Sequence, residues 1–223
     1  MRSFTSLAAR VAAFTSLGLA TLWLAAGAAR ADGLTDLEAF LRQTQQGRAS
    51  FTQVVTPPQK AGETRARAKT SSGQFEFQRP DRFRFQYTRP FEQTIVADGQ
   101  TLWLYDVDLN QVSARRQQEV LGNTPAALLA AAADLKALGR VFELRSDAAT
   151  DGTEWVQATP RQRDGQLQQV RIGFRQGQLA VLDILDSFGQ RSVMTFGALN
   201  VQPGFKPDHF RFTPPQGADV IRQ

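Results

Sequence analysis

The chain contains no cysteine and a single histidine, His209. Without cysteine it can form no disulfide and no thiolate metal site, and it cannot be anchored through an acylated cysteine. Any Ser–His–Asp arrangement, such as that of a hydrolase, would have to use His209. That residue lies in PDHF near the C terminus, where a turn histidine with a structural role is the better interpretation. These absences argue against an enzyme.

The sequence also lacks recognisable cofactor and metal motifs. No glycine-rich phosphate loop occurs. The run DVDLN at residues 106–110 resembles the opening of a calcium loop, but Gln111 stands where glycine is needed and Gln117 where glutamate is needed. We therefore expect a polar turn there, no metal site and no cofactor.

Residues 1–31 have the pattern of a secretory signal peptide. Arg2 and Arg10 precede a long uncharged run, and small residues lead to Ala31 before Asp32. An uncleaved membrane anchor is the alternative, because the run approaches the length of a span. Cleavage after Ala31 would leave a single domain at residues 32–223. An exported protein without disulfides fits a bacterial periplasm.

The basic composition belongs largely to this leader, which holds three arginines and no acidic residue. The remaining chain has only short basic clusters, such as Arg115 and Arg116, which read as solvated faces. A nucleic-acid partner would require a concentrated basic patch. We therefore expect none.

Alternating segments dominate the rest of the chain. In RPDRFRFQY, residues 79–87, a strand would place Phe83 and Phe85 on one face and Arg82 and Arg84 on the other, toward water. Ten or eleven such strands are expected, with turns at Arg89-Pro90, Asp98-Gly99, Asp164-Gly165 and Gln176-Gly177. Their predicted ranges are 49–56, 73–78, 82–88, 93–97, 101–105, 141–145, 154–159, 167–174, 178–186 and 191–196.

Two or three helices accompany the strands. Leu34, Leu37 and Leu41 have helical spacing after a Thr35–Glu38 capping box, which predicts a helix over residues 36–45. A second helix is predicted over residues 125–138, with Thr124 as N-cap and Gly139 just past its end.

Directly linked strands form an antiparallel sheet, and a sheet this large curls or splits. The predicted fold class is therefore mainly β (α+β), an incomplete antiparallel β barrel with an α-helical lid over a hydrophobic cavity. The side chains expected inside it are Phe51, Phe75, Phe77, Phe83, Phe85, Ile95 and Phe174.

The second predicted helix is apolar all round from residue 125 to residue 133. It is too short to span a bilayer. Burial in the core is the simplest explanation. A lid that offers Leu128 or Leu129 to a hydrophobic guest is the functional alternative. Likewise, the aromatic stripe at residues 83–87 could be ordinary core packing.

Several motifs together resemble the family of periplasmic outer-membrane lipoprotein carrier proteins. They are RPDRFRF (79–85), IVADGQTLWLYD (95–106), GNTPAALL (122–129) and FTPPQGADVI (212–221). The likeness spans nearly the whole chain after residue 31. It implies an unclosed barrel with a helical lid. It also implies a chaperone, active as a monomer, that takes acylated lipoproteins from an inner-membrane ABC transporter to an outer-membrane receptor lipoprotein.

The resemblance also implies roles for individual residues. Arg79 matches an arginine that holds the lid shut, although a surface salt bridge is the simpler explanation of an arginine alone. Phe83 matches an aromatic position in ligand transfer, and Leu41 and Leu129 match positions at the cavity mouth. The expected cavity and transfer residues are Leu37, Leu41, Phe51, Phe83, Phe85, Ile95, Leu128 and Leu129. Ala126 and Ala127 depart from the larger apolar residues common in the family, so gating can differ here. The alternative is a related periplasmic protein that binds or senses lipids or acyl groups on the same fold.

Overall fold

The computed structural model describes residues 32–59, 67–120, 132–162 and 166–222. The predicted signal peptide, the turn at Asp164-Gly165, and Leu128 and Leu129 therefore lie outside the described residues.

The described strands form one twelve-stranded sheet in the order β12-β6-β5-β4-β3-β2-β1-β11-β10-β9-β8-β7. Strands β7 and β12 form its two edges and do not pair with each other, so the sheet is unclosed. This confirms the mainly β, open-barrel prediction. The strand bounds are Gln46–Thr56 (β1), Lys69–Gln78 (β2), Arg82–Arg89 (β3), Gln93–Asp98 (β4), Thr101–Asp106 (β5), Gln111–Arg116 (β6), Phe142–Thr150 (β7), Thr153–Pro160 (β8), Leu167–Arg175 (β9), Gln178–Asp186 (β10), Arg191–Phe196 (β11) and Asp219–Arg222 (β12).

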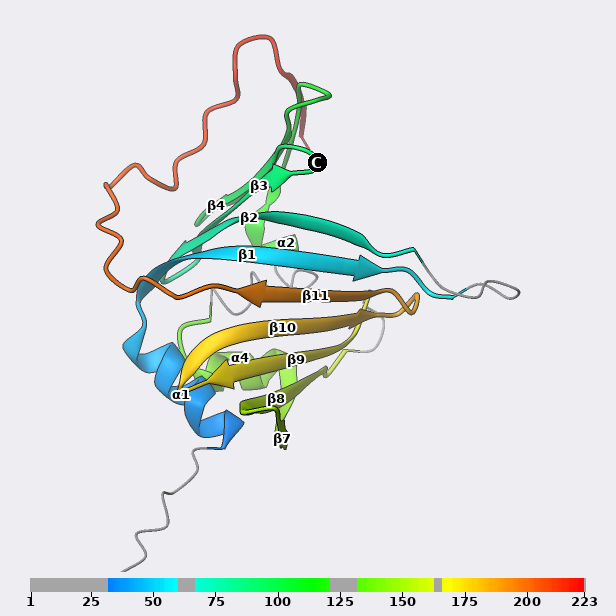
Figure 1. The fold of residues 1–223 in the computed structure, drawn as a ribbon. Coiled ribbons are helices and arrows are strands. Elements are labelled where there is room, and N and C mark those ends of the chain that lie inside the picture. The colour runs from blue at the N-terminus through cyan, green and yellow to red at the C-terminus, as the bar shows by residue number, and fades with distance from the viewer. Residues whose placement is uncertain (1–31, 60–66, 121–131, 163–165, 223) are drawn as a thin grey trace, which may run out of the picture. The chain divides into compact units, whose positions relative to one another are not determined.

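Two meanders make up this sheet, and the antiparallel pairing of β1 with β11 joins them (Figure 1). In the second meander, β9 and β10 are connected by Gln176 and Gly177, whose φ angles are 52° and 72°. Two successive positive φ angles are the signature of a type I′ hairpin turn, as predicted. Strand β12 pairs with β6 in parallel, so the expectation of a wholly antiparallel sheet is wrong at this edge.

Helix α1 (Gly33–Gln43) packs against β7, β8, β9 and β10 and also contacts helix α4 (Leu135–Val141) (Figure 1). The helix begins earlier than predicted because the carboxylate of Asp32, rather than Thr35, is its N-cap and accepts a 2.8 Å hydrogen bond from the Thr35 amide. The short α2 (Gln117–Val120) follows β6. None of the helices in the described ranges is long and apolar enough to cross a membrane.

The predicted single helix over residues 125–138 is wrong in its described part. Residues 132–134 are not helical. A new helix, α4, starts after Asp134, whose carboxylate accepts a 2.7 Å hydrogen bond from the Ala137 amide. Gly139, expected beyond the helix end, lies inside α4. A local cap therefore interrupts the apolar run.

The C-terminal segment, residues 197–218, connects β11 to β12 and is the orange-to-red trace of Figure 1. It covers part of the face of the sheet that carries Arg84. Arg84 is half-buried and donates a hydrogen bond to the carbonyl oxygen of His209. The expectation that this face turns to water is therefore wrong at Arg84, whereas Arg82 is exposed.

Candidate functional site

Aromatic side chains cover the face of the sheet that α1 contacts, called the inner face below. Strands β2 and β3 align Phe75 with Phe85 and Phe77 with Phe83. The rings of Phe75 and Phe85 stack with centroids 4.5 Å apart, and Phe51 of β1 meets Phe85 edge-on at 5.8 Å. Each of these five side chains is at most 3% exposed. Alternation in neighbouring strands thus builds one continuous aromatic surface.

Helix α1 packs on β7 to β10 and meets this surface through Phe40. Leu37 and Leu41 are buried against it, and the ring of Phe40 lies 6.0 Å from that of Phe77 and 5.9 Å from that of Phe174. These three α1 residues follow helical spacing, which places them on one side of the helix. Its apolar side and the aromatic surface therefore belong to one buried cluster.

The structure brings most of the predicted cavity residues together. Leu37, Leu41, Phe51, Phe83 and Phe85 belong to one buried cluster, and Ile95 packs against it while partly exposed. Phe40 and Met194 were missed, although Phe40 sits among the predicted helix leucines. Only the register of α1 against the sheet reveals its role.

Arg79 bridges the chain segments at the edge of this cluster. Its Nε donates to the Thr44 carbonyl oxygen at the end of α1 at 2.9 Å, and its Nη1 donates to the Ala132 carbonyl oxygen at 2.7 Å. Its guanidinium carbon lies 5.3 Å from the ring centroid of Phe40 and 5.1 Å from that of Phe77. The surface salt-bridge alternative is therefore wrong, because this guanidinium is buried and bound to backbone carbonyls.

Burial acts against this cation. Loss of water around the guanidinium lowers the pKa of Arg79 to about 10. Arg79 therefore stays charged at neutral pH, and its hydrogen bonds to two carbonyl oxygens and its contacts with two aromatic rings offset the desolvation. Such a bridge is specific in geometry but modest in net strength.

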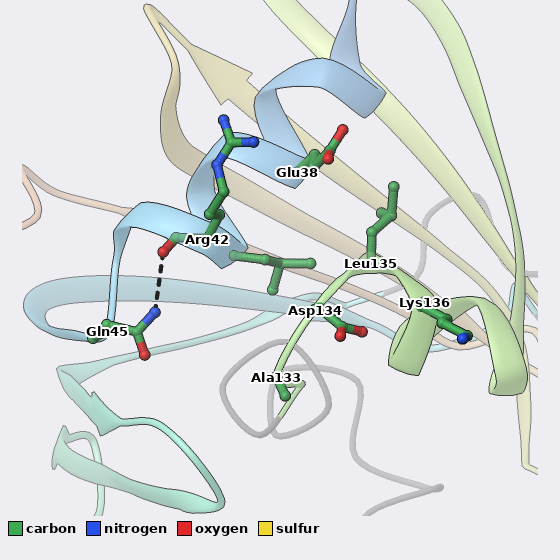
Figure 2. Close-up of a pocket in the computed structure, with 8 residues that line it drawn as sticks. Glu38, Arg42, Gln45, Ala133, Asp134, Leu135 and Lys136 are labelled. Carbon is green, nitrogen blue, oxygen red and sulfur yellow. Dashed lines mark hydrogen bonds between the residues drawn. The ribbon is translucent and has the colours of Figure 1, made fainter.

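A cavity of about 660 Å³ opens between α1 and α4 (Figure 2). Leu41 and Leu135 are its apolar lining, and charged groups of both signs surround them. The charged residues are Glu38, Arg42, Asp134 and Lys136. Figure 2 shows Glu38 and Arg42 projecting from α1 opposite Leu135 and Lys136. The cavity leads from solvent to Leu41 and hence to the aromatic cluster.

At the other end of the inner face the side chains become polar. The hydroxyl of Tyr87 donates to Gln53 Oε1 at 3.0 Å, and Gln53 Nε2 donates to Ser192 Oγ at 2.8 Å. Burial raises the pKa of Tyr87 to about 12, so it remains a neutral donor at physiological pH. This row of hydrogen bonds limits the apolar surface at that end.

The residues considered earlier for catalysis or metal binding, His209 and residues 106–110, lie in or next to turns. His209 lies in a turn on the opposite face, where its Nε2 is 2.7 Å from Glu76 Oε2, in agreement with a structural role. Residues 107–110 form the expected polar turn, which connects β5 to β6. Within the described ranges, no group of three or more acidic and histidine side chains could hold a metal ion.

Comparison with known proteins gives concordant results. The family model of the outer membrane lipoprotein carrier protein LolA matches residues 42–213. An outer-membrane lipoprotein carrier protein of Albidiferax ferrireducens is 60% identical over 92% of this chain and 98% of its own length. One of Methylibium petroleiphilum is 50% identical over 92% and 97%. An uncharacterised conserved protein of Thermus thermophilus shares the fold, with a TM-score of 0.51 at 10% identity over 84% of this chain and 96% of that one. The extent of the family match and these identities show that the chain belongs to the outer membrane lipoprotein carrier protein family.

Proposed function

We propose that this protein is a periplasmic chaperone. It binds the acyl chains of lipoproteins released from the inner membrane and delivers them to an outer-membrane receptor. The observation that carries the proposal is the aromatic inner face, which forms one buried cluster with Leu37, Phe40 and Leu41 of α1, a helix whose end is bonded to Arg79. The function is carriage and not catalysis.

Binding must be weakened for a carrier to release its cargo. Burying one acyl chain of about fifteen methylenes gains about 12 kcal/mol, at about 0.8 kcal/mol per methylene. A protein with a permanently open apolar cavity would hold two or three such chains almost irreversibly. If α1 must leave the aromatic surface before cargo enters, the loss of its contacts weakens the net free energy of cargo binding. They are recovered when the cargo departs.

Arg79 is the residue we assign to this exchange. It connects the end of α1 with the segment before α4 through two carbonyl oxygens. An arginine suits this role because its planar guanidinium presents five donors and remains charged. Leu128 and Leu129, by the family resemblance, would contribute to the same lid and to cargo contact.

The partners follow from this route. We expect an ABC transporter that releases lipoproteins from the inner membrane, a receptor lipoprotein at the outer membrane, and a carrier that works as a monomer. We expect residues 1–31 to direct export and then to be removed, which leaves Asp32 as the first residue of the single mature domain. N-terminal sequencing of the exported protein should begin at Asp32, and an intact Met1 would contradict this assignment.

The function is tested by purifying the exported protein and identifying co-purifying molecules by mass spectrometry. Diacylated or triacylated lipoproteins support the carrier. Free lipids alone would instead favour the alternative, a periplasmic protein that binds or senses lipids or acyl groups on the same fold. Transfer of co-purified lipoprotein to a purified receptor completes the test.

A further inference from the structure

Arg79 belongs to a turn, residues 79–81, that joins β2 to β3; we call it the Arg79 turn. One end of this turn is fixed to the α1–β1 connection, because the Arg79 amide donates to the Gln45 carbonyl oxygen at 2.8 Å. The other end contains Asp81, whose φ is 65°. A residue other than glycine is uncommon at such a φ, so surrounding contacts must hold it there.

Gln117 makes that contact. Its Nε2 donates to the Asp81 carbonyl oxygen at 2.6 Å, and its Oε1 accepts from the Gly99 amide at 3.0 Å. Its own amide donates to the Gln100 carbonyl oxygen at 2.8 Å. Gln117 is 1% exposed, although its neighbour Gln118 is exposed.

The orientation of this side-chain amide is determined by its partners. Asp81 presents a carbonyl oxygen and requires a donor, whereas Gly99 presents an amide and requires an acceptor. Among side chains of this length, only glutamine offers one of each. Leucine has about the same size but offers neither, and it would leave two buried backbone groups unpaired.

We propose that Gln117 is a positioning residue for cargo release. It holds the Arg79 turn, and through it the guanidinium, where Arg79 can reach the Thr44 and Ala132 carbonyl oxygens. The inference rests on the proposed function for its consequence in transfer. The claim that Gln117 holds the Arg79 turn concerns the empty protein alone. The hydrogen bonds of Gln117 go to Asp81, Gly99 and Gln100, so we expect its effect on release to pass through the Arg79 turn.

The first test uses the empty protein. NMR would measure the solvent exchange of the Arg79 Nε–H, which is protected by its bond to Thr44. Gln117→Leu should accelerate this exchange at least about tenfold, whereas Gln118→Leu should not change it. Val112→Ala is a second control, since Val112 is fully buried in β6, where it is opposite Tyr105 of β5. It should lower thermal stability without selectively exposing the Arg79 Nε–H. Unchanged exchange in Gln117→Leu would overturn the inference.

The second test is a double-mutant cycle on transfer of a preloaded lipoprotein to the receptor. As a single change, Gln117→Leu should load normally and slow transfer about tenfold. When it is combined with Arg79→Leu, it should add no further slowing to that of Arg79→Leu alone. Equal slowing in both backgrounds would show that Gln117 acts independently of Arg79, which contradicts the proposal. If even the unmodified protein transfers no lipoprotein, the proposed function fails, and the exchange measurement alone decides the role of Gln117.

Discussion

Arg79 carries a buried positive charge that is bonded to two backbone carbonyl oxygens. Its folded pKa of about 10 lies below that of a free guanidinium, because burial removes water from the charge. At pH values below about 10 the charged form is present in both folded and unfolded chains, so desolvation opposes burial throughout this range. The penalty begins to fall as the pH rises through the folded pKa, and it is gone only above the higher pKa of the unfolded chain. Its hydrogen bonds and ring contacts must therefore outweigh a constant penalty at neutral pH.

Replacing Arg79 with leucine should separate loading from release. The variant loses hydrogen bonds from a charged donor, each worth about 1.5 to 3 kcal/mol, in the empty arrangement but not in the loaded one. We expect loading to persist and transfer to a receptor to slow by about ten- to a hundredfold. Transfer of a preloaded lipoprotein to purified receptor measures this. The exposed Arg82→Leu is the matched control.

Two results would refute the role of Arg79. Transfer at the rate of the unmodified protein would show that its bonds to Thr44 and Ala132 do not govern release. Failure of Arg79→Leu to load would show that it is required for binding instead. Because Arg79 stays mostly charged below a pH of about 10, the difference between Arg79→Leu and unmodified protein should be the same at pH 6 and pH 9.

Phe83 tests the assignment of the two faces of β3. Phe83→Glu places a carboxylate in the fully buried aromatic surface, where it has to lose its water without a partner. Cargo loading should fall at least about tenfold, whereas Arg82→Glu on the other face should load normally. Circular dichroism first establishes that both variants fold. Equal loading by two folded variants would mean that the faces are assigned wrongly.

At the scale of elements, the position of α1 depends on a close backbone approach. A Cβ atom at Gly33 would overlap the Trp155 carbonyl oxygen of β8. This neighbour is backbone within the sheet, so the helix and not the strand would have to move. Glycine at this position therefore lets the first turn of α1 contact β8.

Gly33→Ala should consequently destabilise the protein by about 1 to 3 kcal/mol, because overpacking displaces α1. The corresponding fall in Tm is about 2 to 4 °C per kcal/mol for a chain of this size. Gly139→Ala in α4 is the matched control, since nothing lies within 4 Å of its added Cβ. It should be neutral or stabilising by up to about 1 kcal/mol. Calorimetry of both variants measures the contrast, and equal Tm values would contradict the close approach.

The sequence predicted the meander strands well, because their alternation and turn residues are local signals. It missed β6 and β12. Strand β6, QVSARR, has only two buried apolar side chains, Val112 and Ala114. Strand β12 exists only because its four residues reach β6 from far along the chain. Local patterns contain no information about such a pairing.

The site was predictable to a similar extent. The aromatic surface follows from alternation in RFRF and FEF, and the helix leucines follow from their spacing. The bonds from Arg79 to Thr44 and Ala132 join segments that only the fold brings together, so the sequence could suggest them only through family resemblance. The interruption of the predicted helix at Asp134 was missed because alanine-rich composition outweighed a single capping residue.

For the molecule as a whole, the C-terminal segment is fixed to the outer face by buried polar groups. Glu76 is 4% exposed and contacts both His209 Nε2, at 2.7 Å, and Arg48 Nε, at 2.6 Å. The ring of Phe205 stacks on His209 with centroids 4.4 Å apart. These contacts fix the segment that connects β11 to β12 on the sheet.

His209→Ala should therefore lower stability without affecting transport. The loss of one hydrogen bond to a buried carboxylate is worth about 1.5 to 3 kcal/mol. Denaturant unfolding measures this loss, with the exposed neighbour Asp208→Ala as control. Lipoprotein transfer by folded His209→Ala should equal that of the unmodified protein. A loss of transfer without a loss of stability would instead support a hydrolase that uses His209.

The pairing of β1 with β11 has a consequence for when the molecule can fold. Phe51 is opposite Phe196 in this pairing, so most of the chain lies between the two strands that join the meanders. Each meander can assemble from neighbouring strands, but the junction has to wait until the end of β11 is free to reach β1. Closing so long a loop is slow, since its entropy is lost before its contacts form. A chain threaded from its N terminus through a narrow pore therefore emerges with its central junction unmade, and α1 finds the strands β7 to β10 on which it packs only after most of the chain has passed.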